Sequence, residues 1–394
     1  MPSYPKNYPF YSWMPKPLGI IILLFFFLPI LTVGGVYSVN STEMMSGLGI
    51  ISEHIQFANF VTSIGMAAFA PFLYQLVCVR REKMMCIVGF AFMYIFSYIC
   101  AKTDSVFLLA LCRLLTGFLR MVLMMVNLFT LIWYAGGMEA TRNITPGLEP
   151  KDASGWNKLD IDRCVSQPAV YLFFMILGQS GTALTAWLSF EYEWKYVYYF
   201  MMGILLVSIL LLFITMPNYK FPGRFPINFR KFGNVTAFCV SLTCLTYVLV
   251  YGKVLDWYDD ESIRWATAVS ILFAGIFLYM DARRRSPFVL LDAFKLSTIR
   301  MGALLYLLLM VINSSAMFVN VFAGVGMHID NLQNAALGNW CMVGYAIGAV
   351  LAMALGSKGL HFKYLFAMGF FFLSLSAVFM YFEVQTAGVY ERLK

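Results

Sequence analysis

Long uninterrupted blocks of apolar residues constrain this chain more than any other feature of its sequence. A helix needs about 20 residues to cross hydrocarbon about 30 Å thick, because each residue advances it by about 1.5 Å. Eleven blocks have a suitable length, and their residues do not alternate as in a transmembrane β-strand, so each predicts a helix. The blocks, of which the seventh and eighth are short, are Leu18–Tyr37, Phe57–Val79, Met84–Ala101, Val106–Tyr134, Pro168–Phe190, Tyr196–Met216, Val235–Tyr251, Trp265–Met280, Met301–Val325, Leu337–Leu355 and Tyr364–Phe382.

The composition argues against a soluble enzyme. Charged residues make up 12% of the 394 residues and hydrophobic residues 61%, whereas a soluble domain has about 25% charged residues. The sequence has no Walker loop, dinucleotide-binding glycine fingerprint or HExxH zinc motif in a fitting context. Its eight cysteines have no CxxC or Cys/His metal spacing. We therefore predict an all-α polytopic membrane protein that is not an enzyme and needs neither a metal nor an organic cofactor.

The positive charge of the chain indicates its orientation in a membrane. If the N-terminus is cytoplasmic, the inside segments hold 20 of the 28 Lys and Arg residues, and the outside segments hold 6. Cytoplasmic loops of membrane proteins carry this excess of basic residues. The clusters Arg80–Lys83 and Arg283–Arg285 each lie in a short segment between two spans. The net charge of +8 therefore predicts topology, with the lipid bilayer as partner and no nucleic acid.

Basic, proline-containing linkers divide the chain into groups of helices. A further polar loop is predicted from Ala135 to Gln167 within the first group. The odd number of spans places Lys394 outside and leaves the last group incomplete. Either the chain is truncated, or a second polypeptide supplies the missing helices. The predicted segments are a cytoplasmic N-terminal segment (1–17), a six-helix bundle (18–216), a basic linker (217–234), an additional helix pair (235–280), a second basic linker (281–300) and an incomplete three-helix bundle (301–394).

The fourth predicted span carries the most informative polar residues. Arg113, Gly117 and Arg120 are separated by four and three residues, so they share one helix face, which Asn127 continues. The two arginines are about 10 Å apart along the helix axis, so both cannot reach the same membrane surface. An arginine in mid-membrane costs about 2.5–3.5 kcal/mol or more and usually faces a cavity or a partner. This face is the main candidate for a site, although packing against helix-end carbonyls would also explain it.

The positions of the acidic residues and histidines bear on whether the chain could couple transport to protons. All twenty can be assigned to loops or to the ends of spans, and the three histidines, His54, His328 and His361, also lie near span ends. Proton-coupled carriers commonly relay protons through carboxylates or histidines inside the membrane. The sequence therefore weakens a claim of proton coupling.

Small and polar residues mark a second candidate region in the fifth span. Gly178 and Gly181 can let helices approach or bend, and Gln179 between them is a polar group that can face a pore. Gly344 and Gly348 form a GxxxG pair in the tenth span, which most often serves packing.

Several segments resemble the major facilitator superfamily, in particular its fourteen-helix drug:proton antiporter branch. Leu109–Gly117 is similar to the helix 4 motif, in which glycine follows arginine after four residues. Leu177–Trp187 and Trp194–Tyr199 resemble the helix 5 motif and the aromatic signature that opens helix 6. The segment Gly252–Trp257 resembles the loop of the branch's additional helix pair, and Arg284–Pro287 fits the segment that follows this pair.

The chain departs from this family at four points. The loop between helices 2 and 3 keeps only the basic character of the family's gating motif, in Arg80, Arg81 and Lys83. The Gly-Pro of helix 5 is replaced by Gly178-Gln179, helix 1 has no acidic residue, and the chain has about three helices fewer. The chain therefore lacks the residues on which the family's gating interaction and proline bend depend.

The resemblance implies a secondary transporter of the bacterial inner membrane that exports amphipathic or drug-like molecules by alternating access, with proton coupling left open. Arg113 would be a structural or proton-relay charge, Arg120 a cavity charge, and Gly178, Gln179 and Gly181 a hinge face. Two arginines without a carboxylate in a span favour an anionic substrate. The alternatives are an importer of the same fold and a truncated or split carrier without transport of its own. A periplasmic adaptor or a second polypeptide would then be a partner.

Overall fold

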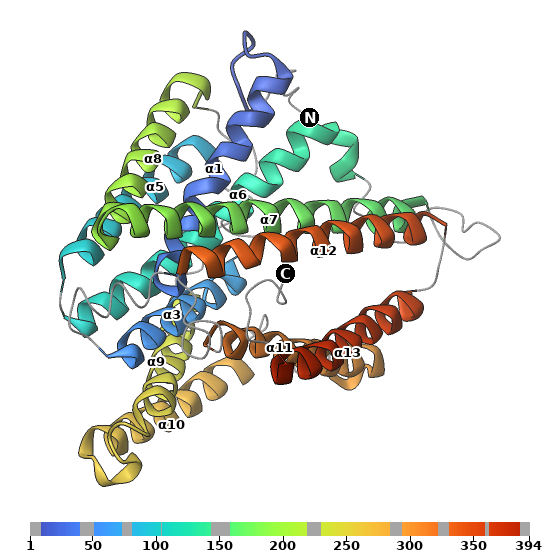
Figure 1. The fold of residues 1–394 in the computed structure, drawn as a ribbon. Helices are drawn as coiled ribbons and strands as arrows, with labels where there is room; N and C mark the ends of the chain where they lie inside the picture. Colours follow the sequence, from blue (N-terminus) through green and yellow to red (C-terminus); the bar gives the residue numbers. More distant parts are fainter. Residues whose placement is uncertain are drawn as a thin grey trace. The chain divides into compact units, whose positions relative to one another are not determined.

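The computed structural model describes residues 9–39, 51–72, 81–103, 105–142, 158–218, 230–283, 294–321, 331–358 and 362–386. Within these ranges the regular structure is helical, and each of the eleven apolar blocks overlaps one α-helix, which confirms the all-helical prediction. The helices, drawn in Figure 1, are α1 (Lys16–Val39), α3 (Ser52–Ala67), α5 (Glu82–Lys102), α6 (Val106–Arg142), α7 (Lys158–Glu191), α8 (Trp194–Thr215), α9 (Arg230–Tyr251), α10 (Glu261–Ala282), α11 (Ser297–Val321), α12 (Asn331–Ser357) and α13 (Phe362–Thr386), with short 3-10 turns η1 (Ala70–Phe72) and η2 (Trp257–Asp259).

Eight of the helices in the described ranges contain a stretch long and apolar enough to cross a membrane. These are α3 together with η1, then α5, α6, α7, α8, α9, α10 and α12. In α1, α11 and α13 the described apolar stretches are shorter, at 10–17 residues. A helix satisfies its own backbone N–H and C=O groups, which is the condition for crossing hydrocarbon. The structure therefore indicates a multi-pass helical membrane protein.

The ends of several helices differ from the sequence prediction. The loop predicted from Ala135 to Gln167 is wrong at both ends, because α6 continues to Arg142 and α7 begins at Lys158. The α9 and α10 helices are each 22 residues long, longer than their apolar blocks. The physical reason is shared: a helix can continue with polar residues where it leaves hydrocarbon, so the apolar block marks the membrane and not the helix end.

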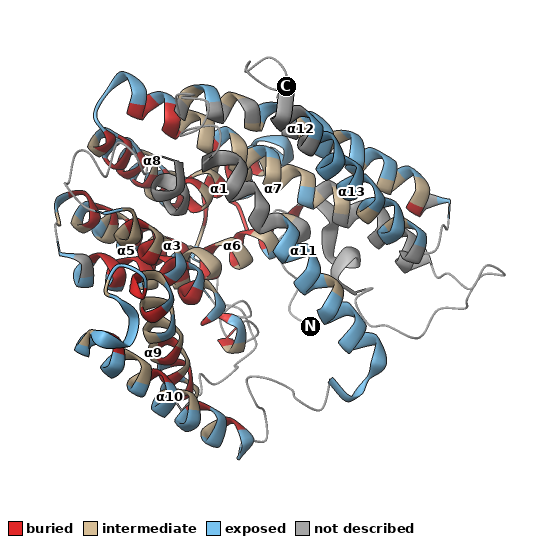
Figure 2. Cartoon of the chain, turned by 60° about the horizontal axis from the view of Figure 1, so that its bottom comes forward, coloured by how far each residue is buried: buried red, intermediate tan, exposed pale blue. Residues whose placement is uncertain are grey.

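The chain divides into two units, of which the first comprises residues Met1–Gly137 and Glu191–Tyr306. In this unit α5 packs against α8, α9 packs against α10 and α3, and α1 packs against α8 and α3. Buried residues gather on the faces that these helices turn toward one another (Figure 2). The candidate residues of α6 belong to this unit.

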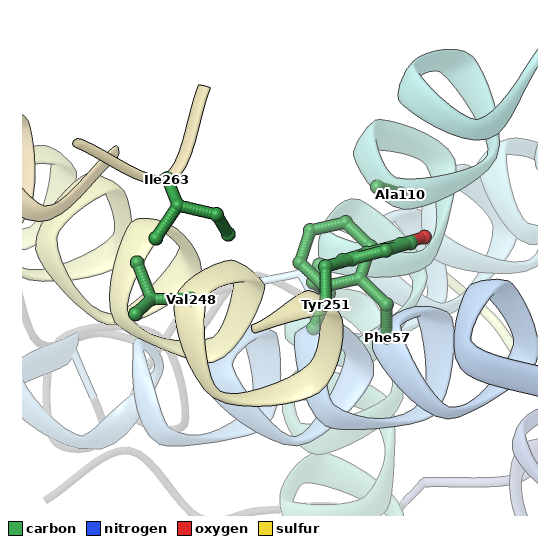
Figure 3. Packing of buried hydrophobic residues seen from close by; sticks show 6 residues of the cluster. Phe57, Ala110, Val248, Tyr251 and Ile263 are labelled. Atoms are coloured by element: carbon green, nitrogen blue, oxygen red, sulfur yellow. The ribbon is translucent and has the colours of Figure 1, made fainter. Parts of the chain in front are cut away.

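One hydrophobic cluster joins four helices of the first unit. Tyr251 of α9 packs on Phe57 of α3, with ring centroids 5.7 Å apart, as Figure 3 shows. Ala110 of α6 and Ile263 of α10 belong to the same cluster, and the side chain of Ile263 is fully buried. The remaining members are Val61 and Val248. This cluster sets the positions of α3, α6, α9 and α10 around one another.

Polar contacts also hold α9 against α10. Ser241 Oγ donates to the carbonyl of Ser270 at 3.0 Å, and Ser270 Oγ donates to the carbonyl of Ser241 at 2.9 Å. Toward the other end of the pair, Asn234 Nδ2 donates to Asp281 Oδ1 at 2.9 Å, and both side chains are buried. Because a polar group buried without a partner is costly, these bonds at two levels specify the register of the two helices.

Asp260 caps the N-terminus of α10. Its carboxylate accepts a hydrogen bond from the backbone N–H of Ser262 at 2.6 Å, as an N-cap residue does. Hydrogen bonds from the side chain and backbone of Ser262 lower the pKa of Asp260. This contribution to stability is present above the ordinary pKa of an aspartate and is lost as the pH falls through the lowered value.

The second unit comprises residues Met138–Phe190 and Leu307–Lys394. It contains most of α7 and all of α12 and α13. The Gln179 side chain of α7 lies directly against the backbone of Gly338 in α12, and α12 also contacts α13. The described side chains of α13 are mostly exposed, which suits a helix surrounded by lipid (Figure 2).

Candidate functional site: the polar stripe of α6

The candidate site is a stripe of polar side chains along one face of α6. Arg113 is 1% exposed and is among the largest fully buried side chains of the described residues. Asn127 is also buried, and Arg120 is half-buried between them. Thr116 and Thr130 lie on the same buried side. We call Arg113, Thr116, Arg120, Asn127 and Thr130 the polar stripe.

The neutral members of the polar stripe are satisfied by their own helix. Thr116 Oγ1 donates to the carbonyl of Cys112 at 2.7 Å, and Asn127 Nδ2 donates to the carbonyl of Leu123 at 2.9 Å. Thr130 Oγ1 donates to the carbonyl of Val126 at 2.8 Å. These bonds to the fourth preceding residue hold the side chains close to the helix. The hydroxyl and amide oxygens keep lone pairs, so they can still accept hydrogen bonds.

The two arginines are the charged members of the polar stripe, and they differ in exposure. Arg113 is enclosed by protein, whereas Arg120 keeps part of its surface open. A guanidinium group offers five N–H donors in a planar fork, which matches a carboxylate, sulfonate or phosphate. With two cations on one face, about 10 Å apart along the axis, the stripe can attract and orient an anionic group.

Two glycines position the polar stripe against α3. A Cβ added at Gly117 would collide with the carbonyl oxygen of Thr62, and a Cβ added at Gly65 would collide with the carbonyl oxygen of Leu114. The contact is therefore reciprocal, with the backbones of α3 and α6 touching where the two glycines lie. Helices in membranes use small residues for such crossings. Sequence reasoning found Gly117 and missed Gly65, although Ala58, Thr62 and Gly65 give a small-residue face that could have indicated it.

The three basic residues of the predicted gating loop differ in their positions and contacts. Arg80 lies outside the described residues, and Arg81 is an exposed residue at the N-cap position of α5. Lys83 Nζ donates to the carbonyls of Phe213 at 3.1 Å and Met216 at 2.6 Å, and it lies 5.3 Å from the ring centroid of Phe213. Lys83 thus caps the C-terminus of α8, where carbonyls lack helical partners. The gating role of this loop stays a prediction.

Replacing Lys83 by methionine should lower stability by about 1 kcal/mol. The substitution keeps an unbranched apolar chain but removes both donors and the positive charge from the end of α8. Lys83→Arg should retain most of the stability, because a guanidinium group can also donate to these carbonyls. Thermal unfolding of the purified protein measures the effect, with Lys253→Met in an exposed turn as the matched control. Equal losses in both methionine variants would contradict the capping role.

The predicted hinge residues of the fifth span lie in the second unit. A Cβ added at Gly178 would meet no heavy atom within 4 Å among the described residues, so close packing does not require this glycine. Gln179 is half-buried against Gly338, and Gly181 is buried. A Cβ added at Gly344 or Gly348 would likewise meet no heavy atom within 4 Å among the described residues, and the helix packing indicated by their GxxxG spacing stays a prediction.

No model of a known protein family matches the sequence, and no curated protein matches it with significant similarity. Within the described ranges, no three His, Cys, Asp or Glu side chains gather as a metal site. In the part of the chain that the structure describes, the regular structure is helical and eight helices are candidate membrane spans. Among these described residues, the polar stripe of α6 is the main concentration of buried polar side chains on one helix.

Proposed function

We propose that the chain is a secondary transporter that moves amphipathic anions across the bacterial inner membrane by alternating access. The observation that carries this proposal is the presence of Arg113 and Arg120 on one face of a span. Charges inside a membrane are costly, and those that persist commonly mark a substrate or ion pathway. The resemblance of Leu109–Gly117 and Trp194–Tyr199 to major facilitator motifs supports the same function.

The two arginines would have different roles in transport. Arg120, whose side chain is half-buried, would contact the anionic group of the substrate directly. Arg113, which is fully buried, would raise the local positive potential and hold the site in shape. Aromatic and aliphatic side chains around the site would contact the apolar part of the substrate, as in most small-molecule sites. The proposed direction is export, and the same assay can detect import.

The test is transport by the purified protein in liposomes. Uptake and release of a fluorescent aryl sulfonate are compared with those of an aryl ammonium of the same ring system, with and without a pH gradient. We expect transport of the anion, reduced about tenfold or more in Arg120→Gln, since a lost charge-assisted bond costs about 1.5–3 kcal/mol. The control is Arg264→Gln, an exposed arginine near the start of α10, which should stay within about twofold of the unchanged protein.

Each other outcome contradicts part of the proposal. Anion transport or binding that Arg120→Gln leaves unchanged would remove Arg120 from the substrate site. Transport of the ammonium probe alone would contradict the anionic substrate class. Transport of neither probe by correctly folded protein would favour a carrier that requires a second polypeptide or another solute. Size-exclusion chromatography of each variant shows that loss of transport is not loss of folding.

A further inference from the structure

The segment before α1 folds back onto the ends of other helices. Phe10 and Met14 are 1% and 2% exposed, whereas Trp13 between them is 60% exposed. The backbone N–H of Met14 donates to the carbonyl of Tyr11 at 3.1 Å, which closes a turn of four residues. This turn leaves Trp13 outside and returns Met14 to the interior. We call residues 9–14 the strap.

A backbone hydrogen bond fastens the strap to the end of α8. The N–H of Tyr11 donates at 3.2 Å to the carbonyl of Thr215, the last residue of this helix. The last carbonyls of a helix have no partners within the helix, so the strap satisfies one of them. Lys83 of α5 binds the neighbouring carbonyls of Phe213 and Met216. The strap therefore lies where α8 ends and α5 begins.

The strap covers Tyr134 of α6 with an aromatic ring. The rings of Phe10 and Tyr134 meet edge to face, with centroids 5.1 Å apart. The Tyr134 ring also lies against the backbone of Gly19 in α1, where an added Cβ would collide with it. As a result the tyrosine side chain is only 5% exposed. The strap and the start of α1 together hold this ring in place.

Tyr134 continues the polar stripe toward one side of the membrane. It lies four residues beyond Thr130 and seven beyond Asn127, so the three side chains share one face of α6, and all three are buried. Successive spans alternate in direction in the predicted topology, so the start of α1 and the ends of α6 and α8 lie on the cytoplasmic side. The strap thus covers the cytoplasmic end of the polar stripe.

The hydroxyl of Tyr134 opposes this closed arrangement. It is buried and has no hydrogen-bond partner among the described residues. A hydroxyl buried without a partner costs free energy, and water would restore the lost hydrogen bond if the strap moved away. Burial of Phe10 and Met14 acts in the other direction, because it removes apolar surface from water. These opposing contributions are what a contact that opens and closes requires.

We propose that the strap is a gate at the cytoplasmic end of the polar stripe, with Phe10 as its movable part and Tyr134 as its seat. When Phe10 lies on Tyr134, the stripe is closed to the cytoplasm. When Phe10 leaves, water and solutes reach Tyr134 and then Thr130, one helical turn further in. The consequence that this movement admits substrate rests on the proposed function, whereas the movement itself does not.

Thiol labelling from the cytoplasmic side tests the gate without any need for transport. The reporter is Thr130→Cys, and the probe is a membrane-impermeant charged methanethiosulfonate added to inside-out vesicles that contain the full-length protein. Mass spectrometry of the peptide that contains position 130 separates this label from labels on the native cysteines. We expect labelling to be about tenfold or more faster with Phe10→Ala, because the apolar contact that closes the gate is lost. Trp13→Ala, which truncates the exposed aromatic residue of the same segment, should stay within about twofold of the reporter protein.

A variant with the opposite effect separates gating from poor folding. Tyr134→Phe keeps the ring but removes the buried hydroxyl, so the closed state should become more stable and labelling at position 130 about threefold or more slower. General destabilisation would make labelling faster. Equal labelling rates with Phe10→Ala and Trp13→Ala, or faster labelling with Tyr134→Phe, would overturn the gate. The predicted labelling rates in a protein that transports neither probe would contradict only the proposed function.

Discussion

Replacing Gly117 by alanine is expected to destabilise the protein by about 1–3 kcal/mol, and Gly65→Ala should have a similar effect. At each position the new Cβ meets a backbone carbonyl of the opposite helix, which cannot turn aside as a side chain can. The helices must separate, and overpacking of this kind typically costs that much. Larger residues such as valine should prevent α3 and α6 from assembling. Thermal unfolding in detergent and the yield of folded protein after purification measure the loss.

The same substitution in α12 provides a matched control. A Cβ added at Gly344 or Gly348 meets no heavy atom within 4 Å among the described residues. Alanine there should be neutral or slightly stabilising, because alanine favours a helix over glycine by about 0.5–1 kcal/mol. If Gly117→Ala and Gly344→Ala changed stability equally, the close crossing of α3 and α6 would be contradicted.

Asn234→Ala is the second substitution with a large expected effect, a loss of about 1–3 kcal/mol. The buried carboxyl group of Asp281 loses the donor at 2.9 Å that Asn234 supplies, while it stays inside the protein. Leaving a buried polar group without one of its bonds costs its desolvation energy, which exceeds the net value of the bond. Reversible unfolding in mixed detergent micelles measures the loss of stability. Limited proteolysis then shows whether the α9–α10 region has become easier to cleave.

A double-mutant cycle separates this contact from general packing. Asn234→Ala, Asp281→Ala and the double variant should show coupling, because both single changes remove the same bond. Ser241→Ala, which removes one neutral bond between the same helices, should cost only about 0.6 kcal/mol, typical of neutral bonds within membranes. Additive effects of Asn234→Ala and Asp281→Ala would contradict the direct contact.

The apolar blocks predicted the helices because hydrocarbon imposes one requirement on every span. Length and hydrophobicity suffice for that prediction, and each block overlaps a helix in the structure. The ends of α6 and α7 were not predictable in the same way. Outside hydrocarbon, water can satisfy the backbone as well as a further helical turn can, so the polar residues after Ala135 decide the end of the helix only weakly.

The contact partners of individual side chains could not be predicted from the sequence either. Spacing placed Arg113, Gly117 and Asn127 on one face, and the structure has all three buried on α6. Nothing in the spacing indicates that Lys83 reaches the end of α8, or that His54 meets Tyr251, because these pairs are 130 and 197 residues apart. Such contacts depend on which helices become neighbours, and periodicity within one helix carries no information about that choice.

The crossing of α3 and α6 has a mechanical consequence. Two helices separated by a layer of side chains can slide, because rotamers can change and fill the space that opens. At Gly65 and Gly117 no such layer exists, since backbone lies directly on backbone. A shift along either axis would drive Cβ atoms of neighbouring residues into the opposite carbonyls. In any change of shape, α3 and α6 must therefore travel together as one rigid body, and the joints that permit movement must lie elsewhere in the chain.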